Sequence, residues 1–299
     1  TGRISIPWIY GLMALSALTN SLDNPAQRAL VFGLLPKAIL PQAISFNLMT
    51  FQFACILGPA LAGLLYAAKG PAWVYGADAF SFLFVIVALV RLHFRPVRPP
   101  KAKPGLKALK EGLGFLMARP ILWNFMIIDF VATLSASLQY QIPFFANDIL
   151  HAGPRGSGLL NSAIALGSLS GAAALSLHPI RRNHGAKMLA AVGVFGFSIL
   201  GFGLSKSFLL SFFLLALSGF CDMFSVVIRQ GLAQIMTPDR LRGRLSAINM
   251  TFFAVGPQLG EMKTGFLAAR IGGPLSAALG GAGCVALAAG YALFSPWMR

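Results

Sequence analysis

The sequence predicts an all-α integral membrane protein that crosses a lipid bilayer many times. Of its 299 residues, 57% are hydrophobic and only 11% are charged, whereas soluble domains carry about 25% charged residues. A soluble core of this chain length has no room for so much apolar surface, so lipid must solvate much of it. The 32 glycines and 18 prolines agree with this class, because membrane helices tolerate residues that break soluble helices.

A membrane-spanning helix needs about 20 mostly apolar residues. By that rule we expect nine spans, at 6–31, 43–68, 72–94, 121–146, 157–178, 187–205, 207–233, 244–269 and 273–297. The polar segment 95–120 carries seven basic residues and reads as a linker on the cytoplasmic side. Its part 104–118 has the leucine spacing of a helix that lies along the membrane surface. The predicted domains are therefore 1–94 with three spans, the linker 95–120, and 121–299 with six spans.

The net charge of +16 follows from the loops. With the loop after the first span placed inside the cell, 15 of the 24 lysines and arginines lie inside, 5 lie outside and 4 lie within spans. This positive-inside bias predicts a cytoplasmic C-terminus. No basic stripe alternates with exposed aromatic residues, so the charge does not indicate nucleic-acid binding.

An internal repeat is the most specific pattern in the chain. Asp23, Arg28, Pro36, Asn47 and Gly58-Pro59 recur in order as Asp222, Arg229, Pro238, Asn249 and Gly256-Pro257. A true repeat implies a unit of six helices, complete in its second copy and short of about three helices in its first. The expectation is then a protein of twelve helices, three of which precede Thr1. Chance similarity between two apolar hairpins is the alternative.

Several motifs resemble those of major facilitator transporters, in the branch that holds the enterobactin exporter and macrolide efflux pumps. They are Asp23-Asn24-Pro25-Ala26, Gly58-Pro59-Ala60-Leu61-Ala62-Gly63, Tyr75-Gly76-Ala77-Asp78 and Thr237-Pro238-Asp239-Arg240-Leu241-Arg242-Gly243-Arg244. The resemblance implies a major facilitator fold that lacks about three N-terminal helices, so the nine spans correspond to helices four to twelve. Helices four, seven and ten would line a central cavity. Glu261 and Lys263 depart from the pattern, because small residues are more typical there.

Charged residues within spans are the first functional candidates, since a charge in a bilayer is costly unless it is paired or faces water. Asp23, Asp129 and Asp222 fall on the three helices that the resemblance assigns to the cavity, and one or more of them would carry the coupling proton. The alternative is structural: Asp23 pairs with Arg28, and Asp222 pairs with Arg229. Asp129 has no basic partner in its own span, which favours it for coupling.

Polar and aromatic residues of the same helices are candidates for the substrate cavity: Gln139, Gln141, Gln230, Gln234 and Phe125. Hydrogen bonding between helices explains the glutamines at least as well, and packing or contact with lipid is the commoner role for a phenylalanine in a membrane helix.

A cytoplasmic gate is predicted in the loop 237–244. Asp239 is placed to cap the following helix, and Arg242 and Arg244, around Gly243, would bond the neighbouring bundle and hold that side shut. Charge that only fixes topology is the alternative. Gly58-Pro59 and Gly256-Pro257 would soften or kink their helices.

Motifs for covalent chemistry are missing from the sequence. It holds no glycine-rich loop for ATP, and its four histidines have no metal-ligand spacing, so neither cofactor nor metal is expected. We expect a monomeric, proton-coupled secondary transporter in a bacterial inner membrane that exports a siderophore, a drug or another small amphiphilic metabolite. A truncated, inactive or regulatory bundle and a membrane-embedded lipid-handling enzyme are the alternatives.

Overall fold

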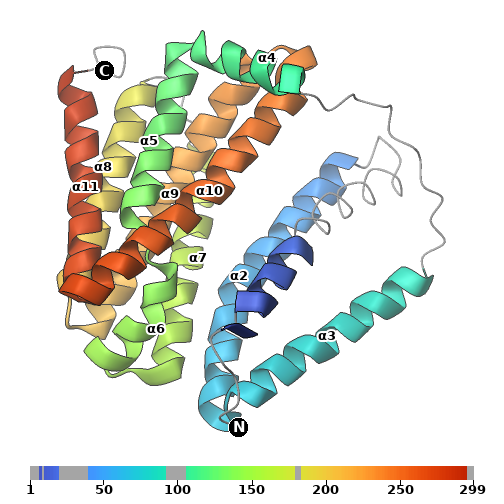
Figure 1. Cartoon of the computed structure of the whole chain (residues 1–299), viewed down its shortest axis with the longest axis vertical. Coiled ribbons are helices and arrows are strands. Elements are labelled where there is room, and N and C mark those ends of the chain that lie inside the picture. Colours follow the sequence, from blue (N-terminus) through green and yellow to red (C-terminus); the bar gives the residue numbers. More distant parts are fainter. Residues whose placement is uncertain (1–6, 9, 20–39, 92–105, 179–182, 295–299) are drawn as a thin grey trace. The chain divides into compact units, whose positions relative to one another are not determined.

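The computed structural model describes residues 7–8, 10–19, 40–91, 106–178 and 183–294, and every regular element in these parts is a helix (Figure 1). The chain divides into two compact units. One consists of Thr1–Phe51 and Ala77–Lys103, and the other of Gln52–Gly76 and Pro104–Arg299. The predicted all-α class therefore holds for the described residues.

The first helices are shaped by their turn residues. Helix α2 (Leu40–Lys69) ends just before Gly70, which has a φ of +83°, and α3 (Pro71–Arg91) begins at the next residue. Glycine adopts this left-handed conformation without strain, and proline suits the first position of a helix because its missing N–H would be unpaired there. None of the residues of α3 is buried within the protein, as expected of an apolar helix that faces lipid.

The second unit holds the remaining helices. They are α4 (Leu106–Met117), α5 (Pro120–Ala136), η1 (Gln139–Gln141), α6 (Ile142–Phe144), η2 (Phe145–Ile149), α7 (Gly153–Leu177), α8 (His184–Leu204), α9 (Phe208–Met236), α10 (Asp239–Ile271) and α11 (Gly273–Phe294). Helix α4 lies within the segment in which the sequence predicts a surface helix. It packs on α10, and its Leu116 is buried.

Six described segments are long and apolar enough to cross a membrane: Pro71–Arg91, Pro120–Ile149, Gly153–Leu177, His184–Leu204, Phe208–Ala233 and Gly273–Leu293. The predicted span 244–269 corresponds to α10, which runs for 33 residues and carries charged residues along its length. The predicted span 6–31 falls largely outside the described residues, so the count of nine spans stays a prediction.

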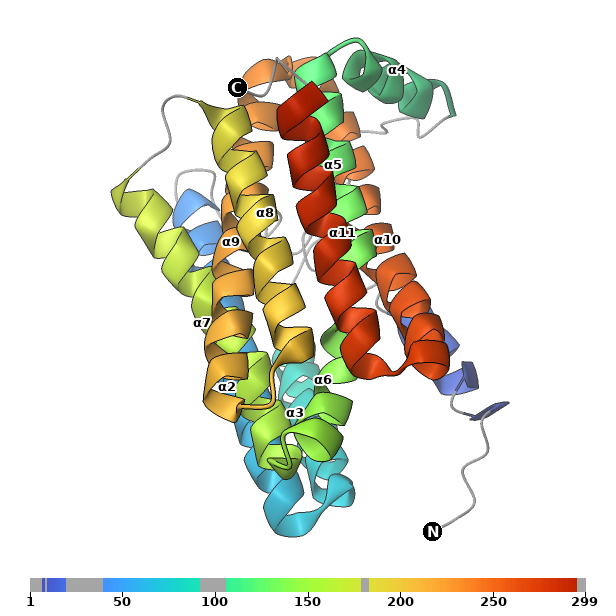
Figure 2. The ribbon, with the colours of Figure 1, turned by 90° about the vertical axis from the view of Figure 1, so that its left-hand side faces the viewer.

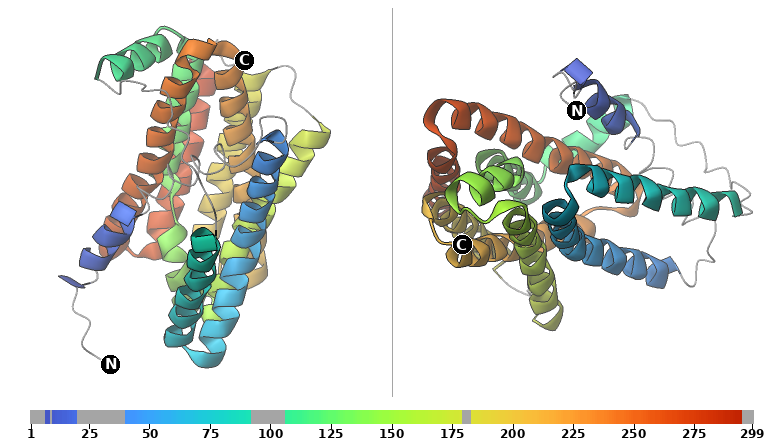
Figure 3. Two further views of the ribbon diagram at one scale, coloured as in Figure 1. Left: turned by 90° about the vertical axis from the view of Figure 1, so that its right-hand side faces the viewer. Right: turned by 90° about the horizontal axis from the view of Figure 1, so that it is seen from below.

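Close helix packing organises the second unit. Helix α9 packs against α7 and α8, α8 also packs against α11, and α5 packs against α10 and α11; Figures 1, 2 and 3 show these helices side by side. At the crossing of α7 and α9, a Cβ atom on Gly167 would lie 1.8 Å from the carbonyl oxygen of Ala216. A Cβ atom on Gly219 would lie 2.1 Å from the carbonyl oxygen of Ile164. Small residues at such crossings let the two backbones touch.

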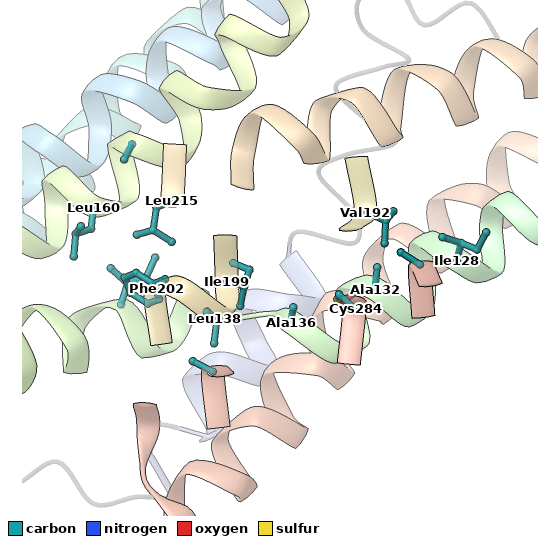
Figure 4. Packing of buried hydrophobic residues seen from close by; sticks show 14 of the residues in the cluster. Ile128, Ala132, Ala136, Leu138, Leu160, Val192, Ile199, Phe202, Leu215 and Cys284 are labelled. Carbon is teal, nitrogen blue, oxygen red and sulfur yellow. The ribbon is translucent and has the colours of Figure 1, made fainter. Parts of the chain in front are cut away.

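The core of this unit is continuous from α5 to α11. Ile128 and Ala132 of α5 lie beside Cys284 of α11 (Figure 4). The thiol of Cys284 donates a hydrogen bond to the carbonyl oxygen of Ala132 at 3.2 Å. Phe125 belongs to the same cluster and is only 2% exposed. The proposed cavity role of Phe125 is therefore wrong for this structure, because its ring is enclosed by packing between helices.

Candidate functional site

A buried ion pair joins two helices in the middle of the second unit. Nη2 of Arg229 on α9 lies 3.2 Å from Oδ2 of Asp129 on α5. The arginine is 3% exposed and the aspartate 9% exposed. Neither charge can reach water without a change in the packing, so each neutralises the other.

Two further polar groups complete this cluster. The hydroxyl of Ser225 donates a hydrogen bond to Oδ1 of Asp129 at 3.0 Å, and Nη1 of Arg229 donates one to Oδ1 of Asn249 on α10. Ser225 and Arg229 are four residues apart on α9, so they approach Asp129 from one face of that helix. The cluster of Asp129, Ser225, Arg229 and Asn249 therefore ties α5, α9 and α10 together.

The pairing of Arg229 differs from the structural alternative in the sequence analysis, which joined Arg229 to Asp222. Seven residues of helix separate those two by about 10.5 Å along the axis, which is too far for direct contact. Asp129, a hundred residues away in the sequence, takes the arginine instead. Asp222 stays within electrostatic influence of both members of the pair.

Asp222 lines a cavity of about 180 Å³ between α5, α7, α8, α9 and α10. Thr133, Ser218, Gln139 and Glu261 also line it. A hollow with hydroxyl, amide and two carboxyl groups has room for water.

The span that carries Asp129 is broken, which the sequence analysis did not foresee. Helix α5 ends at Ala136, and the 3-10 turn η1, the short helix α6 and the π turn η2 follow up to Ile149. Inside a membrane the backbone groups freed by such a break need partners. Glu261 of α10 accepts hydrogen bonds from the backbone N–H groups of Gln139 at 2.7 Å and Tyr140 at 3.3 Å.

Lys263 supports the other side of this break. Its Nζ donates a hydrogen bond to the carbonyl oxygen of Ser135 at 2.7 Å. Glu261 and Lys263 are two residues apart and face different ways, so each needs a partner of its own. The charges that had no explanation in the sequence thus clamp the end of α5, and charge within a span was the signal that marked them.

The four candidate glutamines have different surroundings. The Nε2 group of Gln141, which is buried, donates a hydrogen bond to the carbonyl oxygen of Thr264 at 3.1 Å, so this residue joins helices as the alternative interpretation proposed. Gln139 lies at the rim of the cavity, and Gln230 is exposed on α9. The side chain of Gln234 lies outside the described part of the chain.

The predicted gate is described only in part. Arg244 forms an ion pair with Glu111 of the surface helix α4, and both side chains are partly exposed. Helix α10 begins at Asp239, and its N-cap residue Pro238 makes no side-chain cap. The side chain of Asp239 lies outside the described part of the chain, so its capping role stays a prediction. The side chain of Arg242 and the surroundings of Gly243 are not among the described features.

The predicted kink residues have different surroundings. Helix α2 continues through Pro59, and α10 continues through Pro257. A Cβ atom on Gly256 would lie 2.8 Å from Oγ1 of Thr133, so this glycine permits close contact between α10 and α5, whereas Gly58 has open space around it. Asp23 and Arg28 lie outside the described residues.

Comparison with known families agrees with this helical architecture. The model of the family described as "Transmembrane secretion effector", a group within the major facilitator superfamily, matches residues 1–298. The chain belongs to this family. The resemblance to major facilitator transporters inferred from the motifs is thereby confirmed, and the chain is a multi-pass membrane protein of a transporter family rather than an enzyme.

Curated relatives of the chain include the enterobactin exporter EntS of Citrobacter koseri, 29% identical over 280 residues, and that of Escherichia coli O1:K1, 27% identical over 277 residues. The matches cover 93% and 92% of this chain and 66% of each relative. The chain therefore spans just under two thirds of the length of these relatives.

A solved structure shares the fold. It is the crystal structure of a bacterial homologue of the human lysosomal transporter Spinster, with a TM-score of 0.58 and 16% sequence identity. The similarity covers 90% of this chain and 72% of the other. At this identity the match supports the major facilitator fold and carries no information about substrate.

Proposed function

We propose that the protein is a secondary active exporter that uses the proton gradient to move a small amphiphilic molecule out of the cell. Its relatives are named as exporters of enterobactin, so a siderophore is the first substrate to test, with drugs and other amphiphilic metabolites next. The observation that carries the proposal is the buried ion pair of Asp129 and Arg229 beside the cavity at Asp222.

The pair has the chemistry that proton coupling requires. A proton on Asp129 removes its negative charge and leaves the Arg229 guanidinium without a counter-ion in a site that water does not reach. Arg229 is then drawn towards the remaining carboxylate, Asp222, on its own helix. Because Arg229 is also bonded to Asn249 of α10, this shift would move α9 relative to α5 and α10.

The cavity at Asp222 suggests a route for the proton. Helix α9 starts at the side that the charge bias assigns to the outside, and Asp222 lies nearer that end than Arg229 does. Thr133 and Ser218 bring hydroxyl groups to the same cavity. A proton that enters from outside would reach Asp222 first and then Asp129. An exporter that is driven by protons entering the cell needs this order.

The same residues connect the site to the repeat. Asp222, Arg229 and Asn249 are three members of the second copy, and Asp23, Arg28 and Asn47 occupy the matching places in the first. We infer from this repeat that 1–94 and 121–299 act as two related bundles joined by the linker 95–120.

The decisive experiment follows proton movement in inverted membrane vesicles that contain the protein. Addition of enterobactin to energised vesicles should release protons, measured by the recovery of a quenched acridine dye. Asp129→Asn should abolish this release, and Asp148→Asn, the same change at an exposed position in the π turn, should leave it intact. Flux that persists in Asp129→Asn overturns the coupling role, and absence of flux with every amphiphile tried favours a regulatory or inactive bundle.

A further inference from the structure

The second unit has an apolar groove that the ion-pair site does not use. It lies over α9 between α7 and α8 and has a volume of about 510 Å³. Helices α7 and α8 each pack on α9 far more than on one another, and Figure 2 shows them on either side of it. Phe220, Cys221 and Phe224 of α9 and Val194 of α8 line the groove.

The groove opens towards the surroundings of the protein. Val194 and Leu217, which line it, are 40% and 41% exposed. All three of its helices are long and apolar enough to cross a membrane. The medium outside such a groove is therefore the hydrocarbon of the bilayer, and a lipid acyl chain is the molecule that meets it.

One end of the groove is basic. His178 at the end of α7 and Lys187 in the first turns of α8 both line it and are exposed. None of the carboxylates in the described parts of the chain forms an ion pair with Lys187. The charge bias assigns this end to the cytoplasmic side, where the anionic lipids of a membrane gather.

We propose that this groove binds an anionic phospholipid, with an acyl chain against Phe220, Cys221 and Phe224 and the phosphate beside Lys187 and His178. The aromatic floor of the groove lies on a different face of α9 from Ser225 and Arg229. The lipid therefore packs behind the helix that holds the ion pair and limits how far that helix can move away from α7 and α8.

Native mass spectrometry of the purified protein with equal amounts of phosphatidylglycerol and phosphatidylcholine tests this site. The unaltered protein should retain phosphatidylglycerol preferentially. Lys187→Ala should lower that preference by about 5-fold, the usual effect of one basic residue at a membrane surface. Lys206→Ala, at the opposite end of α8, is the matched control and should keep the full preference.

A second pair of variants tests the apolar part. Val194→Trp fills the groove and should reduce retention of both lipids, and Ala190→Leu serves the same purpose if the tryptophan variant does not fold. Two results would overturn the proposal: equal effects of Lys187→Ala and Lys206→Ala on the lipid preference, or unchanged lipid retention in folded protein with the groove filled.

Discussion

Replacing Asp129 by asparagine keeps the shape of the side chain and removes one charge of the buried pair. Arg229, at 3% exposure, cannot turn to water, and removing one partner of such a pair costs about 3–5 kcal/mol. Asparagine keeps one acceptor oxygen for the hydrogen bond from Ser225, so we expect the lower end, a loss of about 3 kcal/mol in the free energy of unfolding. Arg229→Met, which leaves Asp129 unpaired, should cost about as much.

The double variant gives the sharper test. With both charges gone, no uncompensated ion stays in the core, so the double loss should be smaller than the sum of the single losses by roughly 2 kcal/mol. Unfolding in mixed micelles of dodecylmaltoside and increasing dodecyl sulfate, followed by circular dichroism, measures all three variants. Asp148→Asn is the control and should change stability by less than about 0.5 kcal/mol. Losses that add to within about 0.3 kcal/mol would refute the coupling between Asp129 and Arg229.

Three other sites lead to distinct expectations in the same unfolding assay. Glu261→Ala leaves the N–H groups of Gln139 and Tyr140 unpaired at the end of α5 and should cost about 2 kcal/mol; wild-type stability would mean that the clamp is dispensable. Glu111→Gln removes the partly exposed ion pair with Arg244 and should cost less than about 1 kcal/mol, an effect that 1 M salt should abolish; a loss that survives salt would contradict this. Gly219→Ala forces a Cβ atom against the carbonyl oxygen of Ile164 and should cost about 3 kcal/mol. Its control, Gly231→Ala, lies on the same helix with open space around it and should stabilise the protein by up to about 1 kcal/mol. Equal effects of the two changes would argue against the close crossing of α7 and α9.

Much of the helical framework was predictable because its rules are local. Spans follow from the length of apolar segments, and their ends follow from turn residues such as Gly70-Pro71 and Gly272-Gly273. The break after Ala136 was not predictable in this way. Its apolar composition reads as one continuous span, and the groups that stabilise the break, Glu261 and Lys263, lie more than 120 residues further along the chain.

The candidate site shows the same division. Charge inside apolar segments marked Asp129, Asp222 and Arg229 as residues with a role, but spacing along one helix suggested the wrong partner for Arg229. Which of Asp129 and Asp222 pairs with Arg229 depends on how the faces of α5 and α9 pack against each other, and the sequence does not contain that information. For Phe125 the sequence could not separate a packing role from a cavity role, because buried and cavity-lining phenylalanines lie in equally apolar segments.

What the sequence alone determined is the class of the protein: an apolar chain whose helices cross a bilayer, with charges placed where a bilayer makes them costly. The tertiary structure alone decided which of those charges meet, as Arg229 with Asp129 and Glu261 with the backbone of η1. The physical reason is that burial cost depends on one residue and its local surroundings, whereas an ion pair or a capped helix break needs two segments that only folding brings within about 3 Å of each other.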